Sequence, residues 1–149
     1  MTPSLLGRWQ TRLFLLGTVG VISTLPFAVG WLGAGASFVY FWVLFYVGLL
    51  GLGWDVLYDF AIRFSWDYDW PGILQLGTGV WEGLFLSVLL SQVGLPFLNR
   101  NGFIGWDFWL HYSWVWVWIY LSSWVVMRLL FPRWRHRGGE WIHRWPHQK

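Results

Sequence analysis

The chain has 149 residues, of which 56% are hydrophobic and only 11% are charged. A water-soluble domain of this size could not cover its surface with so few charges, so that class is excluded. Cysteine is absent, which excludes a disulfide framework and a thiolate metal site. The net charge of +3 is small, but the position of the charges along the chain is informative.

Four apolar stretches, each long enough to cross a bilayer, occupy most of the sequence. They cover residues 13–32, 38–57, 73–95 and 108–131. A spanning helix needs about 20 mainly apolar residues. We therefore predict an all-α integral membrane protein, a four-helix transmembrane bundle forming one domain over residues 1–149. Its loops are short, and a basic, tryptophan-rich tail follows at residues 132–149.

The basic residues are divided unequally between the two predicted sides of the membrane. Arg8 and Arg12 precede the first span, Arg63 follows the second, and most of the others come after the fourth. Only Arg100 lies in a connection on the opposite side. The positive-inside rule then places both termini in the cytoplasm. The first apolar run is longer than the core of a signal peptide, so we expect it to be an uncleaved span.

The first two spans are joined by a very short link at residues 33–36, so they should be antiparallel neighbours. Pro26 removes a hydrogen bond from the first span and predicts a kink there. Helix should continue past the second span to about residue 64. Asp69 and Asp107 are suitable N-caps for the third and fourth spans.

Glu82 is the residue whose insertion into the membrane costs the most free energy, because a charge near the middle of a bilayer costs about 2.5–3.5 kcal/mol. If the second and third spans form an antiparallel hairpin, Asp55 lies at a similar depth, and the two carboxylates could share a proton or bind a cation. The alternative is a cytoplasmic charge cluster of Asp55, Asp59 and Arg63, which recur every fourth residue. Glu82 would then bond to a tyrosine or tryptophan side chain.

Small residues form a stripe along one face of the third span. They recur every fourth residue, at Gly79, Gly83, Ser87 and Ser91. Membrane helices associate through such faces because small side chains allow close backbone approach. The stripe predicts either packing within the bundle or a docking face for another subunit.

Three tryptophans lie near the middle of the fourth span, at Trp114, Trp116 and Trp118, and His111 lies one turn into it. Rings on two faces of a helix could line a groove for chlorophyll, carotenoid, quinone or a lipid tail. Alternatively, they fill gaps between helices. An imidazole could ligate the magnesium of a chlorin or form an ordinary interhelical hydrogen bond. No His pair has the spacing of a zinc site, so we predict no metal.

The tail alternates arginine with tryptophan, which suits contact with anionic lipid or with a protein partner. The residues concerned are Arg133, Trp134, Arg135, Arg137, Trp141 and Arg144. Nucleic acid is not an expected partner, because the tail is short and held at a membrane.

The sequence carries no nucleotide-binding, nucleophile or zinc-protease motif. We therefore expect a non-catalytic accessory or assembly subunit of a larger membrane complex, with a pigment- or quinone-containing photosynthetic or respiratory host as the natural setting. The first alternative is a small proton- or ion-coupled transporter or channel that uses Glu82 and Asp55. The second is a membrane-bound enzyme acting on a lipid or quinone.

Overall fold

The computed structural model describes residues 4–62, 72–98 and 105–130. The regular elements in these ranges are helices, and their order and bounds are α1 (Leu5–Leu15), η1 (Leu16–Gly20), α2 (Val21–Ala28), α3 (Val39–Ile62), α4 (Gly72–Gln92), α5 (Trp106–Trp124) and α6 (Val126–Leu130). The all-helical fold expected from the sequence is therefore confirmed for the described part of the chain.

The elements α1, η1 and α2 follow one another without interruption and form one helical rod. The rod begins at Leu5, well before residue 13, because Ser4 caps it: the Ser4 hydroxyl accepts a hydrogen bond from the backbone N–H of Gly7 at 3.1 Å. Arg8 and Arg12, which were expected to precede the first span, both lie inside this helix.

The irregular part of this rod is η1, a turn of π-helix, in which each hydrogen bond spans one residue more than in an α-helix. The sequence placed the irregularity at Pro26 instead. Pro26 lies in the last turn of α2, and its carbonyl accepts hydrogen bonds from the backbone N–H groups of Trp31 and Leu32. It therefore belongs to the end of the rod rather than to a kink in the middle.

Helix α3 runs on to Ile62, so the predicted continuation beyond residue 57 is confirmed as far as the described residues reach. Helix α4 ends at Gln92, short of residue 95, because Gly94 adopts a left-handed conformation with φ of 71°. Asp107 lies inside the first turn of α5, whose N-cap is Gly105, so the capping prediction for Asp107 is wrong. An acidic residue in a first turn still complements the helix dipole. Asp69 lies outside the described residues.

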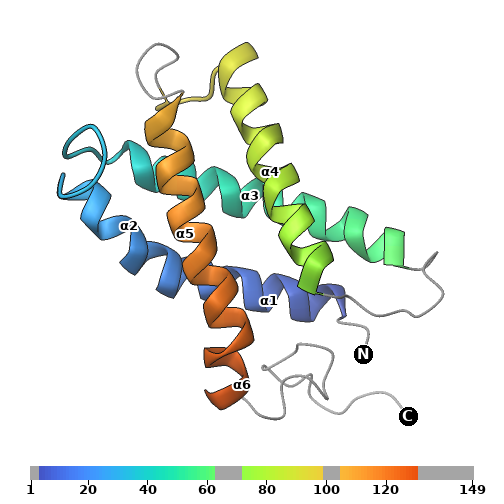
Figure 1. The fold of residues 1–149 in the computed structure, drawn as a ribbon. Coiled ribbons are helices and arrows are strands. Elements are labelled where there is room, and N and C mark those ends of the chain that lie inside the picture. The colour runs from blue at the N-terminus through green and yellow to red at the C-terminus, as the bar shows by residue number, and fades with distance from the viewer. Residues whose placement is uncertain (1–3, 63–71, 99–104, 131–149) are drawn as a thin grey trace, which may run out of the picture.

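Two antiparallel helix pairs cross each other (Figure 1). The α1–α2 rod pairs with α3: the indole N–H of Trp9 donates to the carbonyl of Leu52 at 3.2 Å, and the rings of Phe27 and Tyr40 lie 5.3 Å apart. The expected antiparallel pairing of the first two segments is thus confirmed. Helices α4 and α5 form the other pair. In this view the connection at residues 29–38 lies at the left, and the end of α4 and the start of α5 lie at the top, whereas α3 ends at the right and α6 lies at the bottom.

The core lies where the two pairs cross. One cluster of buried side chains joins α3, α4 and α5, and it comprises Val43, Leu86, Leu90, Leu98, Phe108 and Tyr112. A second cluster joins the rod, α3 and α5, and it comprises Leu16, Leu44 and Val115. Large apolar side chains on the outer faces stay exposed, such as Ile22, Phe60 and Val88. An exposed apolar surface of this kind is typical of contact with a membrane.

Among the described residues, three helices are long and apolar enough to cross a membrane: Leu5–Ala28, Val39–Ile62 and Leu74–Gln92. These helices indicate a membrane protein. Helix α5, the predicted fourth span, is not among them. Its tryptophans and tyrosines, together with His111, lower its hydropathy although they are large and mostly apolar in surface.

Candidate functional site

Arg12 of α1, Asp55 of α3 and Glu82 of α4 meet between the helices. The Nε and Nη2 atoms of Arg12 donate to the two carboxylate oxygens of Asp55 at 2.8 and 2.9 Å. The Nη1 and Nη2 atoms donate to the two oxygens of Glu82 at 2.9 and 3.0 Å. One guanidinium therefore binds two carboxylates, each through a bidentate fork. We call these three residues the charge triad.

The charge triad is largely withdrawn from solvent. The side chains of Asp55 and Glu82 keep 6% and 10% of their surface exposed, and that of Arg12 keeps 21%. Charges in such a place are tolerated only when they are paired and hydrogen-bonded. Because the three members come from three helices, the triad links α1, α3 and α4 through ionic hydrogen bonds.

Gly51 provides the space that the Arg12 side chain occupies. It lies one helical turn before Asp55, on the same face of α3. A Cβ at this position would lie 2.7 Å from Cζ of Arg12, closer than unbonded atoms allow. The pattern of a glycine followed four residues later by an aspartate thus makes a slot with a carboxylate at its end.

Arg8 and Asp59 extend the charged group by one helical turn on α1 and on α3. Arg8 lies one turn before Arg12 in α1, and Asp59 lies one turn after Asp55 in α3. Arg8 interacts electrostatically with both aspartates. The triad has two carboxylates for one guanidinium, and Arg8 and Asp59 together contribute no net charge. The group as a whole therefore carries one excess negative charge when every member is ionised.

The structure brings Asp55 and Glu82 together, and their partner is Arg12. Arg12 was not expected in the site, because the predicted first span begins at residue 13, directly after this charge. The cap formed by Ser4 before Leu5 was the signal that would have extended the helix backwards and placed Arg12 inside it. Arg63, which was expected to join Asp55 and Asp59, lies outside the described residues.

The small-residue stripe of α4 receives aromatic rings from α5. A Cβ on Gly83 would lie 2.6 Å from Cε1 of Tyr112, and one on Gly79 would overlap the indole of Trp116. The Tyr112 hydroxyl also donates to the Gly79 carbonyl at 2.6 Å. Farther along the stripe, Ser87 is half-buried and Ser91 is exposed. Its two glycines therefore lie at a contact within this chain.

The three tryptophans of the predicted cofactor groove have different surroundings. Trp116 is half-buried against α4 and stacks on Tyr120 with ring centroids 5.2 Å apart. Trp114 and Trp118 are exposed and contact each other edge to face, at 5.9 Å. The structure thus places Trp116 in the helix interface and leaves the other two on the outer face of α5.

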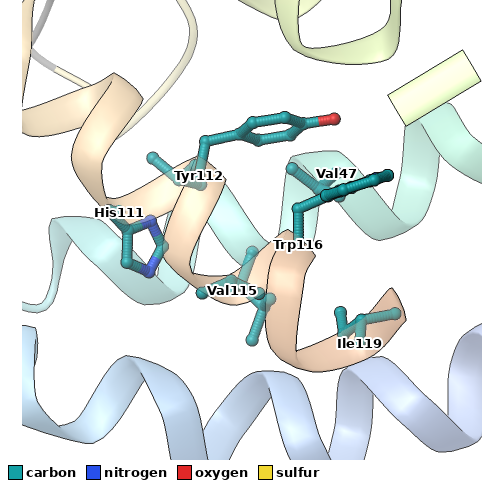
Figure 2. Close-up of a pocket in the computed structure, with 8 residues that line it drawn as sticks. Val47, His111, Tyr112, Val115, Trp116 and Ile119 are labelled. Carbon is teal, nitrogen blue, oxygen red and sulfur yellow. The ribbon is translucent and has the colours of Figure 1, made fainter. Parts of the chain in front are cut away.

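His111 is buried in an aromatic setting. Its Nε2 lies 3.1 Å from the hydroxyl of Thr24, and the rings of Phe27 and Tyr40 each lie 5.0 Å from the imidazole. The imidazole also lines a cavity of about 30 Å³ between α3 and α5, shown in Figure 2. The other lining residues are Val43, Leu44, Val47, Tyr112, Val115, Trp116 and Ile119. A cavity of this size holds a water-sized molecule rather than a chlorin or quinone ring.

Among the described residues, no group of three or more His, Cys, Asp or Glu side chains is placed to hold a metal ion. The arginines and tryptophans of the tail lie outside the described residues. Comparison of the chain with protein-family models, with curated proteins and with solved structures finds no match.

Proposed function

We propose that this chain is a four-span membrane protein with both termini in the cytoplasm. Helix α5 serves as the fourth span. Its length and its antiparallel packing against α4 support this role. The excess of arginine near the predicted cytoplasmic ends gives the orientation.

This topology can be tested by cysteine labelling, because the natural chain contains no cysteine. Single cysteines are introduced by Ala34→Cys, in the exposed 29–38 connection, and by Gln148→Cys, in the tail. We expect a membrane-impermeant maleimide to label the first in intact cells and the second only after permeabilisation. Labelling of both from outside would mean an odd number of spans and would contradict the proposal.

Within that topology, we propose that the protein is a non-catalytic accessory or assembly subunit of a larger membrane complex. The observation that carries this proposal is the charge triad. A transport pathway would require the carboxylates of Asp55 and Glu82. Both oxygens of each carboxylate accept hydrogen bonds from Arg12, between three helices. Groups held in this way serve to fix helices in place, and the protein then acts through its outer surface.

The outer surface over α3 and α4 supports this role. The ring of Trp54 contacts those of Trp81 and Phe85 edge to face, with centroids 5.9 and 5.2 Å apart, and the last two side chains are exposed. Large aromatic residues are enriched where protein partners bind. We propose other membrane subunits as the partners, in a pigment- or quinone-containing energy-converting complex, whose flat ligands suit such rings.

The test is purification of the tagged protein from its native membrane in a mild detergent, followed by mass analysis and an absorption spectrum. We expect it to migrate with larger membrane proteins, and the variant Trp81→Ala/Phe85→Ala to lose them while remaining folded. Val88→Ala, which shortens another exposed side chain of α4, is the matched control. A lone monomer in every mild detergent would contradict the proposal.

A proton- or ion-coupled transporter is the second candidate, and the excess negative charge of the triad favours it. In liposomes, such a protein would carry a flux that Glu82→Gln abolishes while the fold survives. That result would establish transport and replace the accessory role, whereas equal background flux in both proteins would exclude this candidate.

A further inference from the structure

Two polar anchors attach the first rod to the rest of the molecule, one on each side of η1. Before η1, Arg12 binds Asp55 and Glu82. After η1, the fully buried hydroxyl of Thr24 contacts Nε2 of His111 at 3.1 Å. Both side chains must therefore lie on the face of the rod that packs against the other helices.

In a regular α-helix, Arg12 and Thr24 could not both face the helices that carry their partners. Arg12 and Thr24 are separated by about 12 steps, which at 3.6 residues per turn places them roughly 120° apart around the axis. A π turn accommodates one additional residue, so that about 11 regular steps remain and the two side chains lie roughly 20° apart. The π turn thus puts both anchors on one face.

We propose that η1 is a conformational device that sets the angle between Arg12 and Thr24 around the helix axis. It thereby couples the charge triad to the Thr24–His111 contact. If η1 relaxed to α-helix, Arg12 would turn about 100° relative to Thr24, and one of the two anchors would be lost. The contacts hold the rod in the less favourable π form.

One side of η1 packs against the other helices, whereas its opposite side is exposed. Leu16 packs in a cluster with Leu44 and Val115, and a Cβ on Gly20 would lie 3.0 Å from Leu44. Gly17 is exposed, with nothing within 4 Å of the position that its Cβ would occupy. Gly17 can therefore be removed without leaving a cavity.

The first experiment compares two single-residue deletions in detergent-solubilised protein. Deletion of Gly17 should let η1 become α-helical with both anchors kept, so the melting temperature stays the same or rises. Deletion of Leu49, also an exposed residue but in the regular helix α3, should turn Asp55 out of the triad and lower the melting temperature sharply. An equally damaging deletion of Gly17 would overturn the proposal.

The second experiment measures the coupling. One variant removes the first anchor by the neutral set Arg12→Met/Asp55→Asn/Glu82→Gln, and another removes the second by Thr24→Val. Loss of either anchor lets η1 relax, which recovers part of the stability, so the combined variant should lose more in melting temperature than the sum of the two. In protein lacking Gly17 the two losses should add, because no strained turn remains. Additive losses in both backgrounds would refute the coupling.

Discussion

Replacement of Arg12 by methionine is expected to destabilise the protein by about 3–5 kcal/mol, because it leaves two carboxylates together without their shared counter-charge. The arginine supplies all four hydrogen bonds that join the triad, so no other partner in it can compensate. The free energy of unfolding can be measured in mixed micelles with increasing sodium dodecyl sulfate, followed by tryptophan fluorescence.

Two further variants separate the loss of pairing from the loss of the long side chain. Asp55→Asn/Glu82→Gln in the Arg12→Met background should recover much of the lost stability, because no unpaired charge then remains. Arg12→Lys should be intermediate, since an ammonium group cannot form two planar forks. If Arg12→Met unfolded at the same point as the natural protein, the triad would not be a structural link.

Replacement of Gly83 by isoleucine is expected to cost about 3 kcal/mol or more, because overpacking at a closed contact displaces its neighbours. The new Cβ alone would come within 2.6 Å of Tyr112, which also holds the Gly79 carbonyl through its hydroxyl. The branched side chain would therefore separate α4 from α5. The same micelle unfolding measurement reports the loss.

Gly77→Ile provides the matched control on the same helix, since nothing lies within 4 Å of a Cβ at Gly77. That variant should unfold close to the natural protein. If Gly83→Ile were as stable as Gly77→Ile but released protein partners from the native complex, the stripe would be a docking face for another subunit.

The fold follows from the sequence where physical periodicity is strong. Long apolar runs predict helices because a membrane leaves few other ways to satisfy the backbone, and the positions of α3 and α4 agree with that rule. Asp55 and Glu82 were paired by the antiparallel geometry of their helices alone. The glycines at 79 and 83 likewise follow from the spacing of small residues.

The features of the fold and of the site that the sequence did not predict depend on tertiary structure. Arg12 was treated as a boundary because an isolated charge is costly in lipid, and only the position of its two acceptors makes the interior acceptable. The π turn has no sequence signature of its own: it results from the need to satisfy Arg12 and Thr24 together. Trp114, Trp116 and Trp118 look alike along the sequence, but only the placement of α4 decides which of them is covered.

Because the chain is synthesised from its N-terminus, the members of the charge triad leave the ribosome at different times. Arg12 leaves the ribosome 43 residues before Asp55 and 70 residues before Glu82. At about 5–20 residues per second, several seconds pass in which the guanidinium has no acidic partner and stays near the headgroups. If the first rod crosses the bilayer as proposed, its final depth is reached only after the third crossing has been translated. Insertion of this chain is then a collective event rather than a sequence of independent steps.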